Sequence, residues 1–217
     1  MTNESSDTGN PGGDRDNAEF DTGLAVALRQ AGRHAEAVSR LKFATTRLPP
    51  DARVFLELGY QLVLMDRYDE AIDVLEHGLQ IAPTMLELSV QLGYAHLSRA
   101  DCSNAKVAFA RALDLSPHSG DALFGIAKAH QEVGENEAAA AYFRRYLTGR
   151  PNDGGAWLNL GHCLLELGQL DAGYECFRRA ARGEASRYGT ALTSLAAAPR
   201  GRFWLRPSAA ARFLRAH

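Results

Sequence analysis

The sequence lacks several features that would place it in a large class at once. No apolar run approaches the ~18 residues of a membrane span, and the first 17 residues lack the apolar stretch of a secretory signal. The three cysteines, Cys102, Cys163 and Cys176, form no CxxC pair. The net charge is only −2, so the molecule as a whole does not attract nucleic acid. These absences favour a reduced, cytoplasmic protein, and the Ala, Arg and Gly content is typical of a bacterial source.

The motifs of common enzyme classes are absent as well. There is no glycine-rich phosphate loop, nucleophile elbow or zinc-ligand spacing. His96 and His130 hold equivalent places in a repeated pattern, but no carboxylate or thiol obviously joins them. We therefore expect no enzymatic activity, no metal site and no cofactor.

A single period, about 34 residues long, runs through most of the chain. One series of prolines, two series of small residues and one series of large apolar residues recur with this period. These are Pro49, Pro83, Pro117 and Pro151; Ala25, Gly59, Gly93, Ala127 and Gly161; Ala37, Ala71, Ala105, Ala139 and Gly173; and Leu41, Leu75, Phe109, Phe143 and Phe177. Four series with one period predict a stack of repeated units.

Each unit is predicted to form two helices. In residues 52–85 the helices are expected at 52–65 and 69–82, with a polar turn at Asp66 and Arg67 between them. We expect Gly59 and Ala71 to face each other and allow the backbones to approach closely, while Leu75 fills the space between units. Pro83 ends the second helix because it lacks an N–H and clashes with the preceding turn.

This pattern resembles the tetratricopeptide repeat family, most clearly in the fifth unit. The matching residues are Trp157, Leu160, Gly161, Gly168, Phe177 and Ala180. The resemblance implies an all-α fold, a right-handed α-solenoid of five tetratricopeptide helical hairpins (18–51, 52–85, 86–119, 120–153 and 154–187, together 18–187) plus C-terminal capping helices. Residues 1–17, rich in Ser, Asn, Gly and Asp, are expected to be disordered. Residues 188–217 are expected to form the basic caps.

Two residues depart from the pattern of the repeats. Asp21 stands where a large apolar residue is usual, as expected of an outer end that is exposed to solvent. Tyr146 stands where the other units have a small residue, which predicts that the fourth hairpin is splayed.

The resemblance also implies a concave surface, lined by the first helix of each hairpin, that binds a peptide or an amphipathic helix. Tyr60, Tyr94 and Phe124 are candidate anchors, since aromatic residues often dominate such contacts. The alternative is that individual side chains pack between neighbouring helices. The carboxylate clamp of relatives that bind chaperone tails is absent. The candidate groove residues are Leu56, Tyr60, Leu64, Val90, Tyr94, Leu97, Phe124, Lys128, Leu158, Asn159 and His162.

The C-terminal segment is strongly basic. From Arg182 onward there are seven arginines and one acid, Glu184, so this segment carries +6 while the rest carries −8. Three interpretations stay open: a solvated cap, contact with an anionic partner, or Phe203, Trp204 and Leu205 blocking the chain's own groove. The residues singled out are Arg200, Arg202, Trp204, Arg206 and Arg212.

The sequence thus predicts an adaptor or chaperone-like scaffold whose partner is another protein. The alternative is an anion-binding protein that contacts RNA or an acidic membrane or protein surface through its arginine-rich tail. Nucleic acid is not the expected partner of the acidic body, and a homo-oligomer stays open.

Overall fold

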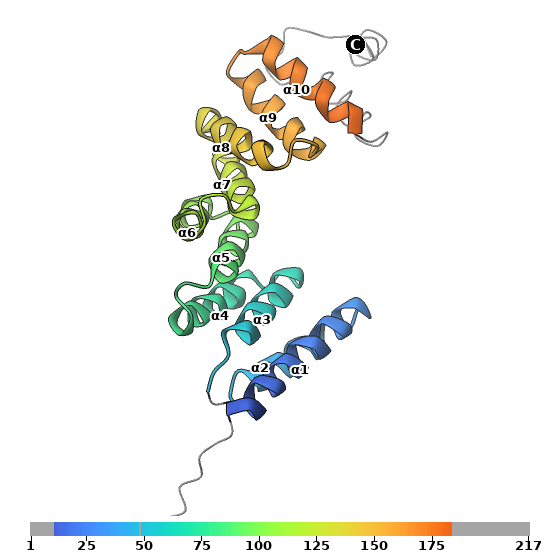
Figure 1. Cartoon of the computed structure of the whole chain (residues 1–217), viewed down its shortest axis with the longest axis vertical. Coiled ribbons are helices and arrows are strands. Elements are labelled where there is room, and N and C mark those ends of the chain that lie inside the picture. Colours follow the sequence, from blue (N-terminus) through green and yellow to red (C-terminus); the bar gives the residue numbers. More distant parts are fainter. Residues whose placement is uncertain (1–10, 48, 184–217) are drawn as a thin grey trace, which may run out of the picture. The chain divides into compact units, whose positions relative to one another are not determined.

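The computed structural model describes residues 11–47 and 49–183, which form ten α-helices arranged as consecutive hairpins (Figure 1). No strand occurs in this part of the chain. The helices are α1 (Pro11–Gln30), α2 (His34–Ala44), α3 (Ala52–Leu64), α4 (Tyr68–Ile81), α5 (Leu86–Ser98), α6 (Cys102–Leu115), α7 (Gly120–Glu132), α8 (Asn136–Gly149), α9 (Gly154–Glu166) and α10 (Leu170–Gly183). The all-α repeat fold is confirmed.

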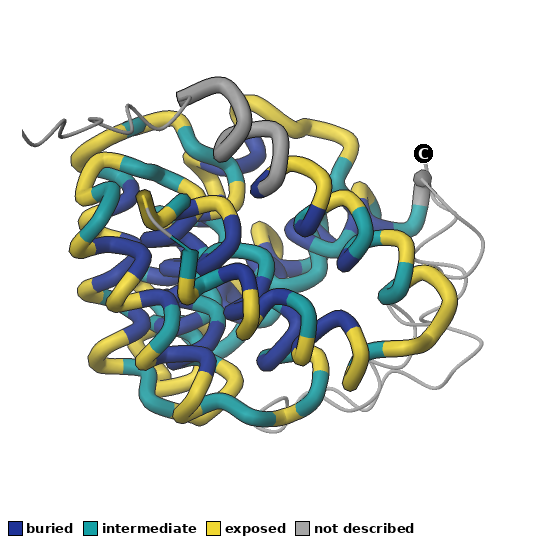
Figure 2. The backbone as a smooth tube through the Cα atoms, turned by 90° about the horizontal axis from the view of Figure 1, so that it is seen from below, coloured by how far each residue is buried: buried dark blue, intermediate teal, exposed yellow. Residues whose placement is uncertain are grey.

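Contacts divide the chain into two compact units, residues 1–100 and 101–217, which we call unit 1 and unit 2. Unit 1 contains α1 to α5, and unit 2 contains α6 to α10. In each unit the buried residues recur on the helix sides that meet neighbouring helices (Figure 2). Each unit therefore has a core of its own.

Polar residues set where several first helices begin. The side chains of Asp51, Ser119 and Asp153 accept hydrogen bonds from backbone N–H groups in the first turns of α3, α7 and α9. Such caps satisfy donors that have no partner within the helix, and each is worth about 1 kcal/mol. α3, α5, α7 and α9 begin at the four residues where the sequence period starts a new unit.

The turn inside each hairpin repeats one backbone feature. Gly32, Asp66, Ala100, Gly134 and Gly168 all have positive φ, between 57° and 77°, and each occupies the same place in its own repeat. Glycine adopts this conformation without steric cost, whereas a side chain with a β-carbon is strained there. The turn geometry is thus kept even where the repeat has lost its glycine.

Glycine lets the two helices of a hairpin approach closely, as predicted. The residue that the glycine faces differs in part from the prediction. A β-carbon on Gly59 would lie 2.5 Å from Cγ and Cδ2 of Leu75, so the closest neighbour of Gly59 is this leucine and not Ala71. In the fifth hairpin a β-carbon on Gly161 would lie 2.9 Å from Cε1 of Phe177, the equivalent of Leu75, and 3.2 Å from the carbonyl oxygen of Gly173. There the two small residues do face each other.

The prediction for Asp21 is wrong. Its side chain is fully buried and forms ion pairs with Arg40 (Nε to Oδ1, 2.7 Å) and Arg47 (Nη1 to Oδ2, 2.7 Å) from the second helix and the turn after it. A buried carboxylate is tolerated only when it is paired and hydrogen-bonded. The two arginines, each more than one-third exposed, supply that pairing and reach solvent with the rest of their side chains.

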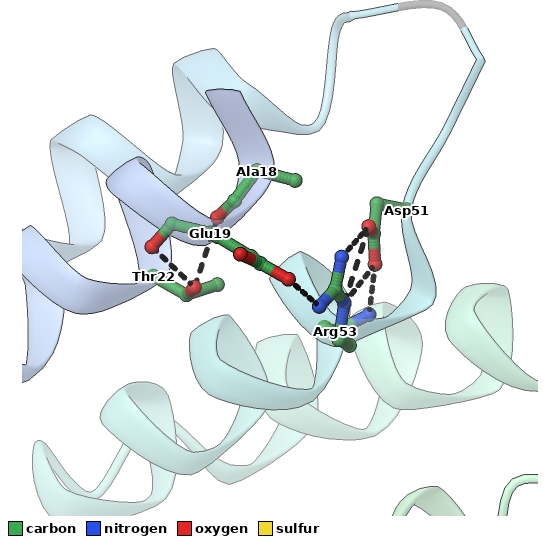
Figure 3. A network of polar contacts seen from close by, with 5 residues as sticks. All are labelled: Ala18, Glu19, Thr22, Asp51 and Arg53. Carbon is green, nitrogen blue, oxygen red and sulfur yellow. Dashed lines mark hydrogen bonds and ion pairs between the residues drawn. The ribbon is translucent and has the colours of Figure 1, made fainter. Parts of the chain in front are cut away.

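The first helix also begins earlier than expected, at Pro11, so residues 11–17 are helical and the expectation of disorder over 1–17 fails for them. Proline is compatible with a first helical position because its missing N–H needs no partner there. Further along, Glu19 accepts a hydrogen bond of 2.9 Å from Arg53, whose guanidinium also binds Asp51 (Figure 3). This network ties α1 to the start of α3.

Tyr146 lies inside the core of unit 2 with 8% of its surface exposed. Its ring centroid is 5.3 Å from that of Phe124, and its hydroxyl donates a 2.7 Å hydrogen bond to Asp153. Phe124 also meets Phe143 edge to face at 5.6 Å. Three aromatic rings therefore pack α7 against α8 at the place where splaying was expected.

Candidate protein-binding surfaces

In unit 1 the first helices α1, α3 and α5 lie side by side, and α3 carries apolar side chains spaced four residues apart. Leu56 and Tyr60 are half-buried, and Leu64 is 46% exposed. Residues at this spacing share one face of a helix. α3 therefore presents a continuous apolar strip that ends in an exposed leucine.

The helix beside it continues this strip in part. Tyr94 and Leu97 on α5 are half-buried. Val90 is only 6% exposed and belongs to the core, so the expectation that it lines the groove is wrong. Its β-branched side chain packs against neighbouring helices instead. We call Leu56, Tyr60, Leu64, Tyr94 and Leu97 the unit 1 patch.

A polar network that the sequence did not reveal holds this patch in place. The guanidinium of Arg29 lies 5.0 Å from the ring centroid of Tyr60 and 3.6 Å from a carboxylate oxygen of Glu57. Glu57 also accepts a 2.7 Å hydrogen bond from Gln61, which is fully buried. Arg29 thus covers one face of Tyr60, an attraction of about 0.5–1 kcal/mol at such a site.

In unit 2 the predicted residues divide between packing and surface. Phe124 is half-buried and joins the aromatic cluster described above, so its role is structural in part. Lys128 pairs with Glu132 on the same helix at 3.1 Å. Gln131, next to them on α7, donates a 3.4 Å hydrogen bond to the carbonyl oxygen of Asn159 on α9.

The remaining predicted residues of unit 2 lie on α9. Leu158, Asn159 and His162 are half-buried, and the His162 ring meets Phe177 edge to face at 5.3 Å. Burial lowers the pKa of His162 below its ordinary value, the nearby Lys128 charge also lowers it, and Glu166 opposes both. The ring is therefore neutral at pH 7 and suited to apolar or hydrogen-bonded contacts.

Several histidine and cysteine side chains of unit 2 are paired or buried. No group of three or more metal-ligating side chains occurs in this part of the chain. His130 stacks on Tyr142 and pairs with Glu135. Burial raises the pKa of both Cys163 and Cys176 to about 11. Their thiols are therefore protonated and weakly nucleophilic at pH 7.

The basic-tail residues Arg200, Arg202, Trp204, Arg206 and Arg212 lie outside the described residues, as do the expected capping helices. Their role stays a prediction. Among the helices that the structure describes, none has the length and apolar content to cross a membrane.

Comparison with sequence families finds the tetratricopeptide repeat in three stretches of the chain. One family profile matches residues 22–85 and 90–154, and a second matches residues 132–197. Together they include part of every described hairpin and leave residues 11–21 and 86–89 unmatched. None of the curated proteins matches the chain.

Solved structures share the fold at low sequence identity. A crystal structure of MamA has a TM-score of 0.69 and 20% identity, covering 79% of this chain and 94% of its own. A MamA RS-1 double mutant has a TM-score of 0.71 and 17% identity, with coverage of 79% and 97%. The thermophilic protein TTC0263 of Thermus thermophilus has a TM-score of 0.65 and 17% identity, with coverage of 81% and 99%. At these identities the likeness establishes the fold alone.

Proposed function

Because the chain belongs to the tetratricopeptide repeat family, we propose that it is a protein-interaction scaffold that binds an extended or helical segment of a partner through the unit 1 patch. The observation that carries the proposal is the apolar strip on α3, in which half-buried Leu56 and Tyr60 lead to Leu64, 46% exposed. When a partner covers a contiguous strip of exposed apolar side chains, the removal of this surface from water stabilises the complex.

The chemistry of the patch favours an amphipathic partner segment. Leu64 and Leu97 offer apolar contacts, and Tyr60 and Tyr94 offer aromatic rings. Arg29 and Glu57 border Tyr60 with opposite charges. A helix with apolar residues at three- and four-residue spacing and polar residues elsewhere matches this arrangement.

Site-specific photo-crosslinking of the protein inside the source cell tests the proposal. A photo-reactive phenylalanine analogue is placed at Leu64, and a matched one at Val107, which is 68% exposed on a second helix, α6. We expect one abundant partner adduct from position 64 that is absent from position 107. Adducts of equal abundance at both positions would contradict a partner seated on the first helices.

A substitution then separates binding from folding. Tyr60→Ala/Tyr94→Ala should abolish the adduct at position 64 while circular dichroism still shows a folded helical array. The control Phe43→Ala removes an aromatic ring of 59% exposure from α2, a second helix, and should leave the adduct intact. Retention of the adduct in the folded double variant would refute the role of the patch.

A further inference from the structure

A pocket of about 540 Å³ opens in unit 2, lined by residues of α8, α9 and α10. This volume falls within the ~300–1,000 Å³ of typical ligand pockets. Buried Leu147, Leu160 and Leu164 line it, and Trp157 forms part of its wall. None of the predicted groove residues lines this pocket. It is therefore a second, separate feature of the chain.

The preceding hairpin shows what occupies the equivalent place there. One repeat before Cys176 lies Tyr142, and one repeat before Leu164 lies His130. The rings of Tyr142 and His130 stack with centroids 5.5 Å apart and an angle of 15° between their planes. Arg145 lies 5.6 Å from the Tyr142 centroid. The equivalent places in the other hairpins hold Arg40, Val74, Ala108 and Cys176, so only the fourth hairpin fills this place with an aromatic ring of its own.

The rim of this pocket carries an excess of positive charge. Arg144 and Arg179 line it, together with a single acid, Glu175. Glu175 is shared, since it accepts hydrogen bonds from Arg179 at 3.2 Å and from Arg178 at 3.1 Å. No carboxylate of the described residues pairs with Arg144, whose equivalent in the preceding hairpin is Ala110. Arg179 also lies 4.7 Å from the Trp157 ring centroid.

We propose that this pocket binds a partner protein through an aromatic side chain that is flanked by acidic residues. The ring takes the place that Tyr142 fills one hairpin earlier, against Leu164 and Trp157. The neighbouring carboxylates meet Arg144 and Arg179, since a guanidinium pairs with a carboxylate through two parallel hydrogen bonds. The rim has the same sign of charge as the segment from Arg182 onward, which carries +6, so an acidic partner is the better match in charge.

Fluorescence polarisation on the full chain tests the proposal with a labelled peptide that has one phenylalanine between two pairs of aspartates. We expect saturable binding that is weakened at least ~tenfold when alanine replaces the phenylalanine or lysines replace the aspartates. Absence of binding at millimolar protein would overturn the proposal. So would binding of a single-stranded oligonucleotide of equal charge in preference to the peptide.

Two variants locate the site. Cys176→Tyr supplies the ring that the preceding hairpin already accommodates and should exclude the peptide, and Arg144→Glu should weaken it at least ~tenfold by reversing a charge on the rim. The control Arg33→Glu changes charge by the same amount on the exposed surface of unit 1 and should alter affinity less than ~twofold. Thermal melting monitors folding. Peptide binding that survives Arg144→Glu in the folded protein refutes the proposal, whether or not Cys176→Tyr folds.

Discussion

Replacement of Gly59 by alanine adds one methyl group and tests whether the contact between α3 and α4 requires a glycine. Gly59 lies in the middle of α3 and is buried, and its new β-carbon would lie 2.5 Å from two carbons of Leu75 and 3.0 Å from a third. One of the two closest atoms is Cγ, which moves only if the whole leucine side chain moves. Leu75 is itself fully buried, so it has no solvent to move into.

Two opposing effects set the size of the change. Alanine stabilises a helix interior by ~1 kcal/mol relative to glycine. Overpacking of a close-packed core costs ~1–3 kcal/mol, and a contact this short with a buried side chain belongs at the upper end. We therefore expect Gly59→Ala to lower the free energy of unfolding by ~1–2 kcal/mol.

Gly23 provides the matched control. It also lies in a first helix, α1, but is exposed, and a β-carbon there would meet nothing within 4 Å. Gly23→Ala should therefore raise stability by ~0.5–1 kcal/mol through helix propensity alone. Urea titration followed by far-ultraviolet circular dichroism compares the two variants under the same conditions.

A double-mutant cycle identifies the clash as the cause. Leu75→Ala alone should cost ~2–5 kcal/mol because it leaves a cavity. In Gly59→Ala/Leu75→Ala the new methyl group has room, so the double variant should be at least ~1 kcal/mol more stable than the sum of the single effects predicts. If Gly59→Ala stabilises the protein as much as Gly23→Ala does, the reasoning that glycine is required at this contact is refuted.

Three further perturbations follow from the same structure. Ala100→Gly should raise stability by ~0.5–1 kcal/mol by relieving strain at a φ of 63°, and Gly134→Ala should lower it by ~1 kcal/mol, as thermal melting would show. Ser89→Ala should stabilise by ~1 kcal/mol in urea titration, since the Ser89 hydroxyl is fully buried and has no hydrogen-bond partner among the described residues. Burial raises the pKa of Cys163 and Cys176 from 9.0 to about 11, so stability should be full below pH 9 and fall as the pH rises through 11, less so in a double alanine variant.

The fold could be predicted because the residues that recur with the period act on the backbone close to their own position in the chain. Proline stops helices and small residues mark close contacts wherever they occur. Hence the first residues of α3, α5, α7 and α9 coincide with the predicted unit starts. The same register puts Leu56 and Tyr60 on one helix face, and both are half-buried there; their part in binding stays a prediction.

What the sequence could not reveal depends on partners from distant positions. Asp21 was expected at the surface, and only the folded chain brings Arg40 and Arg47 within 2.7 Å of it. Val90 occupies the same register as Leu56, yet its burial differs because different neighbours cover it. The pocket between α8 and α10 was missed for the same reason. The sequence shows an aromatic ring at this place only in the fourth hairpin, at Tyr142, and this has a meaning only once the surroundings of that ring are known.

Tyr146 shows how neighbouring repeats compensate for a change of side-chain size. In the second hairpin the equivalent residue is Gly78, where a β-carbon would lie 2.9 Å from a methyl carbon of Leu88 in the next hairpin. The equivalent of Leu88 beside Tyr146 is Ala156, which is fully buried in the same cluster. In the fourth hairpin a large residue on the second helix is thus matched by a small one on the following first helix. This exchange keeps the fourth hairpin packed despite its departure from the family pattern, and it means that departures from a repeat should be interpreted in pairs across the contact.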